Sequence, residues 1–133
     1  MSNVITTSRT EEQDTTPTDR KTLVFFVGTD PAVDPGPLRT AQHFASVAAG
    51  AGLAAELRVA GQATRSIGLV DAPAAGVDLT ICPRGMSKYG ITDEQVDAIG
   101  GRTRTLAEIL TDVADGRAVL IPVTHSIDDP QEA

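Results

Sequence analysis

The stretch TLVFFV, residues 22–27, carries five apolar residues in six and is followed by Gly28. A strand with one face in water alternates apolar and polar residues, whereas a strand that is covered on both faces is apolar almost throughout. We therefore predict that residues 22–27 form a strand buried on both sides. Such strands are typical of parallel sheets that have helices on both faces.

The segment that follows this strand has the pattern of a helix. After the proline-rich turn GTDPAVDPGP, residues 38–51 read LRTAQHFASVAAGA, and the apolar residues recur at helical spacing: Leu38, Ala41, Ala45 and Ala48, with Phe44 and Val47 widening the stripe. Because most of these side chains are small, the helix can approach a sheet closely. We predict a helix over residues 38–51 packed against the first strand.

The next segment, AAELRVA over residues 54–60, alternates apolar residues with Glu56 and Arg58. Alternation with charged residues is typical of a strand that has one face in water. We therefore place this strand at an edge of the sheet, outside the first strand.

The remainder of the chain gives further strands and two clear helix starts. Residues 77–82 (VDLTIC) and 118–123 (AVLIPV) read as strands, and Pro122 favours an edge position because proline cannot donate to a neighbouring strand. Residues 100–105 (GGRTRT) are short and polar, so whether they form a strand stays open. The capping-box pairs are Thr92 with Gln95 and Thr105 with Glu108, and the stop signals are Gly100 and Gly116. The second of these helices has an apolar stripe that we expect to be buried: Leu106, Ile109, Leu110 and Val113.

Strands that alternate with helices predict an α/β protein. We expect a three-layer α/β/α domain with a mostly parallel, doubly wound sheet of about five strands. If residues 54–60 lie at the edge, the strands at 22–27 and 77–82 are neighbours, and their carboxyl ends form a ligand-binding crevice. In that arrangement Gly28–Asp30 and Cys82–Arg84 lie together.

Composition and charge limit the domain organisation and the classes of function that the chain can have. The chain has 133 residues and a net charge of -7, and residues 1–20 and 128–133 account for -5 of it. We predict a polar N-terminal tail over 1–20, one domain over 21–127 and an acidic tail over 128–133. Four aromatic residues and no basic stripe argue against nucleic-acid binding. There is no membrane-length apolar run and no secretory pattern in the first twenty residues, so we expect a cytoplasmic protein.

Cys82 is the only cysteine in the chain, which excludes an internal disulfide and a cysteine-based zinc site. It ends the predicted strand 77–82 and is followed by Pro83, a residue suited to the first turn of a helix. The thiol would then face free backbone donors that favour the thiolate, with Arg84 and Lys88 adding positive charge. The alternative is that Cys82 is a small buried hydrophobic residue, which is the commonest role of a free cysteine.

These features resemble the DsrE/DsrF/TusD family of small sulfur-relay proteins. The resemblance covers roughly Thr22 to Val123: the apolar first strand, the alanine-rich helix, the strand that ends in Cys82, the glycine in KYGIT (Gly90) and the closing LAEILTDVADGRAVLIPV. It departs from the family in CPRGMSKYG, where Pro and Arg replace small apolar residues, and this predicts a shortened or rearranged helix after Cys82.

The resemblance implies a sulfur carrier or sulfurtransferase in which Cys82 holds sulfane sulfur as a persulfide, with Arg84 and Lys88 in support. It implies donor and acceptor proteins as partners, assembly into homo- or hetero-oligomers, and no metal or organic cofactor. Two alternatives stay open. One is a non-catalytic DsrE-like binding or scaffold subunit of a larger complex, and the other is a thiol redox sensor.

Overall fold

The structure, a computed structural model, describes residues 21–126. In this part of the chain five strands form one sheet, and every neighbouring pair is parallel. The spatial order is β4-β3-β2-β1-β5. The strands are β1 (Thr22–Val27), β2 (Ala54–Val59), β3 (Val77–Ile81), β4 (Arg102–Thr103) and β5 (Ala118–Pro122). The predicted tails, residues 1–20 and 128–133, lie outside the described residues, as does residue 127.

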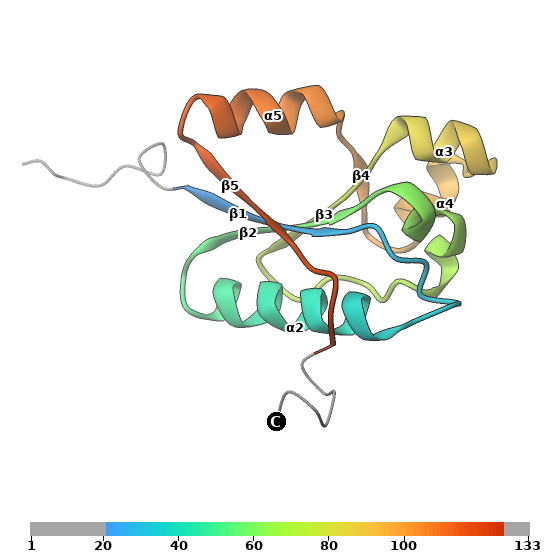
Figure 1. Cartoon of the computed structure of the whole chain (residues 1–133), viewed down its shortest axis with the longest axis horizontal. Coiled ribbons are helices and arrows are strands. Elements are labelled where there is room, and N and C mark those ends of the chain that lie inside the picture. Colours follow the sequence, from blue (N-terminus) through green and yellow to red (C-terminus); the bar gives the residue numbers. More distant parts are fainter. Residues whose placement is uncertain (1–20, 127–133) are drawn as a thin grey trace, which may run out of the picture.

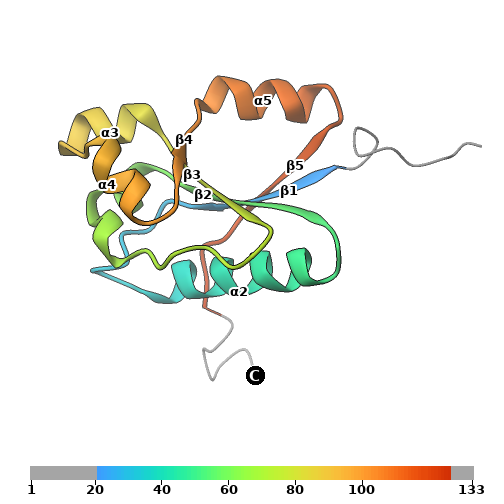
Figure 2. The same cartoon turned by 180° about the vertical axis from the view of Figure 1, so that it is seen from behind.

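Helices cover both faces of the sheet, which confirms the three-layer α/β/α prediction. Helix α2 (Gly36–Gly50) lies along one face and α5 (Leu106–Ala114) along the other (Figures 1 and 2). The remaining elements gather at the end of the sheet at which β1 ends: the 3-10 helix η2 (Gly61–Leu69), α3 (Pro83–Tyr89) and α4 (Asp93–Ala98). None of the helices between residues 21 and 126 has the length and apolar character that a membrane crossing requires.

The main core lies between the sheet and α2. Its buried residues include Leu38, Ala41 and Ala45 from the helix and Phe25, Val27, Leu57, Val59, Leu79 and Ile81 from the strands. A smaller cluster on the α5 face consists of Val24, Ile109 and Ala118, with Val113 and Leu120 packed against it. Because Val24 faces α5 while Phe25 and Val27 face α2, β1 is buried on both sides, as its apolar sequence predicts.

The predicted strand order is wrong, because β2 is a central strand and not an edge. It pairs with β1 on one side and β3 on the other. At the carboxyl ends, the Val27 carbonyl accepts the Ala60 N–H, while the Val59 carbonyl accepts the Cys82 N–H. The end of β2 therefore separates Cys82 from Gly28–Asp30, and the predicted crevice between β1 and β3 does not exist. The cause is that the charged side chains of β2, Glu56 and Arg58, are buried inside the protein and are not solvated.

The outer strands and the helix ends agree with the predictions from the sequence. Strand β5, with Pro122, forms one edge, and residues 102–103 form the short strand β4 at the other, which answers the open question on this segment. Both capping boxes are present, at Thr92 with Gln95 and at Thr105 with Glu108.

The predicted buried stripe of α5 is only partly correct. Ile109 is buried, but Leu106 and Leu110 are 43% and 48% exposed. The helix covers the sheet through Ile109, and its other apolar side faces a hollow next to Cys82.

Gly85 allows α3 to pack closely on η2. A Cβ added at Gly85 would lie 2.8 Å from Thr64 Oγ1 and 3.1 Å from Thr64 Cβ, and both residues are buried. Overpacking of this kind costs about 1–3 kcal/mol, while alanine regains about 1 kcal/mol of helix propensity. We expect Gly85→Ala to lower the free energy of unfolding, measured by urea denaturation, by up to about 2 kcal/mol. The control is Gly68→Ala, because a Cβ there meets nothing within 4 Å. Equal stability of the two variants would show that α3 shifts away from η2 without cost.

Candidate functional site

Polar side chains gather on the α5 face of β2 and β3, two neighbouring inner strands of the sheet. Glu56 and Arg58 alternate with the core residues of β2, and Thr80 occupies the matching position on β3. The strand register pairs Arg58 with Thr80, so Cys82 follows on the same face, two residues further along. Glu56 is 2% exposed and Arg58 is 0% exposed. Buried charges require partners, and these partners define the site.

The carboxylate of Glu56 is held by two donors. Thr80 Oγ1 donates to Glu56 Oε2 at 2.6 Å, and Arg104 Nε donates to the same oxygen at 3.3 Å. Arg104 also donates through Nη2 to Asp112 Oδ2 at 2.5 Å. The hydrogen bonds from Arg104 and, after it, from Arg117 hold the pKa of Asp112 below its ordinary value. The charges on the α5 face therefore form a continuous network that reaches from β2 to α5.

Arg58 lacks a carboxylate partner in the described part of the chain. Its Nη1 donates to the Arg104 carbonyl oxygen at 2.5 Å and to Thr80 Oγ1 at 3.4 Å, both of which are neutral acceptors. Its Nε and Nη2 are buried and have no hydrogen-bond partner. Between residues 21 and 126, no carboxylate lies within ion-pair distance of this guanidinium.

Cys82 is a neighbour of Arg58 across the strand pair, because it comes two residues after Thr80, the register partner of Arg58. Burial lowers the pKa of Arg58, and the negative charges of Cys82 and then of Glu56 oppose this lowering. A side chain diagonally opposite on the neighbouring strand is within reach of a long residue such as arginine. The geometry therefore brings a buried cation to a thiol that is partly exposed.

Cys82 is the N-cap residue of α3, as its position before Pro83 predicts. Its backbone carbonyl accepts the Met86 N–H at 3.0 Å, but its side chain makes no capping hydrogen bond. Helix α3 has only seven residues, in keeping with the predicted shortening. The Cys82 side chain therefore makes no hydrogen bond to the free backbone donors at the start of α3.

Two hollows meet at Cys82. The first lies between α3 and α5, has a volume of about 440 Å³ and is mostly apolar; it is lined by Cys82, Pro83, Arg84, Thr105, Leu106, Ala107 and Leu110. The second lies between η2 and α3, has a volume of about 370 Å³ and is lined by Gly61, Gln62, Cys82, Arg84, Gly85, Lys88 and Tyr89. The structure thus brings the three predicted site residues together around the second hollow.

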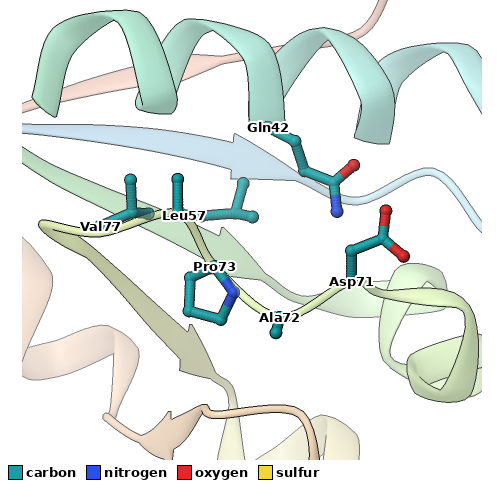
Figure 3. Close-up of a pocket in the computed structure, with 7 residues that line it drawn as sticks. Gln42, Leu57, Asp71, Ala72, Pro73 and Val77 are labelled. Atoms are coloured by element: carbon teal, nitrogen blue, oxygen red, sulfur yellow. The ribbon is translucent and has the colours of Figure 1, made fainter. Parts of the chain in front are cut away.

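A third hollow lies on the opposite face, beneath α2 (Figure 3). It has a volume of about 170 Å³. Gln42 reaches toward Asp71 across it, and the side chains of Leu57, Pro73 and Val77 form its apolar side. Because it contains no nucleophile and none of the three predicted residues lines it, we do not assign the chemistry of the protein to this hollow.

No group of three His, Cys, Asp or Glu residues within 21–126 is arranged to hold a metal ion. His43 lies exposed on α2, with its ring centroid 6.2 Å from that of Phe44. The candidate site therefore consists of the thiol, its buried cation and the two hollows.

Arg58 was missed by the sequence analysis because charged residues that alternate in a strand are more often exposed. The signal that could have found it is the group of charged residues that follows β3, which includes Arg104 and Asp112. These residues provide partners for a charged strand face, but only when α5 is placed over β2.

Comparison with solved structures shows the fold. A conserved protein of unknown function from Bacteroides thetaiotaomicron is similar to this chain, with a TM-score of 0.60 and 12% sequence identity, over 77% of this chain and 95% of that one. No family model matches the sequence, and no curated protein matches it. At this identity the likeness concerns the α/β/α architecture alone, so function has to be argued from the chemistry at Cys82.

Proposed function

We propose that this protein is a small sulfur carrier in which Cys82 accepts sulfane sulfur and passes it on as a persulfide. The observation that carries the proposal is the buried guanidinium of Arg58, which lacks a carboxylate partner among the described residues and belongs to the strand next to the one that Cys82 follows. A neighbouring cation favours the anionic form of a sulfur group. Both a thiolate and a persulfide are anions that Arg58 can stabilise.

The reaction transfers a sulfur atom without any external oxidant or reductant. The Cys82 thiolate attacks the outer sulfur of a donor persulfide. A new S–S bond forms on Cys82 while the S–S bond of the donor breaks, and the donor leaves as a thiolate. An acceptor nucleophile then attacks the outer sulfur, and the Cys82 thiolate is released.

The surroundings of Cys82 are consistent with this exchange. The thiol is partly exposed and opens on two hollows, so a donor and an acceptor can reach it. The resemblance to the sulfur-relay family adds donor and acceptor proteins as partners and assembly into oligomers. The proposal includes no metal or organic cofactor. A lone carrier thiol must stay reduced between turnovers, so the proposal includes a cytoplasmic location.

The test is sulfur uptake by the native protein. After incubation with polysulfide, we expect the intact mass to rise by whole sulfur atoms, and we expect reductant to reverse the change. The control is Cys82→Ser, which should keep its circular dichroism spectrum and take up no sulfur. Uptake by the denatured wild-type protein but not by the native one would refute the proposal, because Cys82 would then be a shielded core residue.

The same pairing of a partly exposed thiol with a buried cation also favours a thiol redox sensor. The two functions differ in the stable product. A sensor would react with dilute peroxide to give a sulfenic acid, whereas a carrier would react faster with polysulfide. Since the chain has no second cysteine, a sensor would need a partner thiol to form a disulfide.

A further inference from the structure

The hollow between η2 and α3, here called the basic hollow, contains two cationic side chains beside the thiol. Arg84 and Lys88 are both exposed, and both line it together with Cys82. The Lys88 ammonium lies 5.5 Å from the ring centroid of Tyr89, another lining residue. A cation over an aromatic ring is favourable, so this contact keeps Lys88 at the rim.

The charge of the basic hollow is not neutralised within the described part of the chain. No carboxylate is among its seven lining residues, and neither Arg84 nor Lys88 has an ion-pair partner in residues 21–126. Three other basic residues of the described part are paired: Arg102 with Asp78, Arg104 with Glu56 and Asp112, and Arg117 with Asp112 and Asp115, whereas Lys21, Arg39, Arg58 and Arg65 have no ion pair there. The approach to Cys82 through this hollow is thus positive in a protein whose net charge is -7.

The other approach to the sulfur has a different character. The hollow between α3 and α5 is formed mainly by carbon atoms, from residues such as Pro83, Leu106 and Leu110. Arg84 lines both hollows, but Lys88 lines only the basic one. An anion is attracted along the basic side, and Lys88 is the residue that distinguishes the two routes.

We propose that the basic hollow admits a small anionic sulfur donor, a polysulfide or a low-molecular-weight persulfide, to Cys82. This inference rests on the proposed function and assigns the class of donor. A volume of about 370 Å³ suits a small molecule. Unpaired cations in a recess raise the local concentration of anions and their rate of arrival.

The test compares two reagents that form the same carbon–sulfur bond with the thiolate but differ in charge, iodoacetate (anionic) and iodoacetamide (neutral). Both rates depend equally on the thiolate fraction of Cys82, so this fraction cancels in their ratio. We expect the iodoacetate-to-iodoacetamide ratio to exceed that of an unstructured cysteine peptide by about tenfold at low salt. High salt should remove most of this excess, since it screens exposed charges.

Variants that each remove one positive charge identify the hollow through which an anion reaches Cys82. Lys88→Gln should lower the ratio by about twofold or more, and Arg84→Gln should do the same. The matched control is Arg39→Gln, which removes an exposed cation from α2 and should leave the ratio unchanged. Leu106→Glu, which adds a negative charge to the apolar hollow, should affect the ratio less than Lys88→Gln does.

The outcomes separate this inference from the proposed function. A ratio equal to that of the peptide, or one that Lys88→Gln does not change, would overturn the inference while polysulfide uptake on Cys82 still supported the carrier. A larger fall in Leu106→Glu than in Lys88→Gln would also overturn it, since anions would then enter by the other hollow. If the carrier proposal failed instead, sulfur uptake would be absent although the ratio stayed high.

Discussion

Replacing Glu56 by alanine is expected to lower the free energy of unfolding by about 3–5 kcal/mol, because removing one member of a buried ionic group leaves its partners uncompensated. Glu56 is 2% exposed and accepts hydrogen bonds from Thr80 and Arg104. Without this carboxylate, Arg104 keeps only Asp112 as a carboxylate partner, and Arg58 still has none among the described residues. Urea denaturation monitored by circular dichroism measures the loss.

A matched control lies on the neighbouring strand. Asp78 is the register partner of Glu56 and accepts two hydrogen bonds from Arg102, at 2.9 and 2.6 Å. The side chains of this pair are 41% and 56% exposed, so Asp78→Ala should cost no more than about 1 kcal/mol. If Glu56→Ala cost as little as Asp78→Ala, the buried network would not stabilise the α5 face of the sheet.

Replacing Arg58 by methionine is expected to slow the alkylation of Cys82 by iodoacetamide about tenfold at mildly acidic pH, while the protein stays folded. A neighbouring cation favours the anionic form of a thiol, so its loss should lower the fraction of the protein that reacts at mildly acidic pH. An apolar residue of similar volume often replaces a buried ion without loss of stability, and Arg104 still balances Glu56. The measurement is the rate of alkylation as a function of pH.

The control for this prediction is Arg104→Met. Arg104 belongs to the same network, but its side chain bonds Glu56 and Asp112. Its replacement should reduce stability and leave the midpoint of the alkylation profile nearly unchanged. A profile that did not move in Arg58→Met would show that the guanidinium does not act on the sulfur, and the main support for the carrier proposal would be lost.

The parts of the fold that local sequence determines were predicted well. The apolar run of β1, the capping boxes at Thr92 and Thr105 and the stop signals at Gly100 and Gly116 each involve residues a few positions apart, and each has its expected role in the structure. The position of β2 could not be predicted in the same way. Arg58, on its charged face, donates a hydrogen bond to the backbone carbonyl of Arg104, which is 46 residues further along the sequence.

The candidate site also has one part that local sequence predicts and one part that it does not. Cys82, Arg84 and Lys88 lie within one short segment, so their proximity follows from the sequence, and the structure places all three around one hollow. Arg58 joins them only through the pairing of β2 with β3, and nothing local to Arg58 distinguishes it from a solvated strand residue. For the same reason the exposure of Leu106 and Leu110 was not predicted, because it depends on where α5 crosses the sheet.

The pairing of β5 with β1 has a consequence for synthesis. Residue 22 pairs with residue 118, so the sheet remains incomplete until residue 118 has left the ribosome. Until α5 and β5 arrive, the uncovered face of β2 and β3 presents Glu56, Arg58 and Thr80 to water. Exposed apolar surface on partly folded chains promotes aggregation, whereas a polar face is readily solvated. The polar side chains that later form the buried network are thus readily solvated while the sheet is still open.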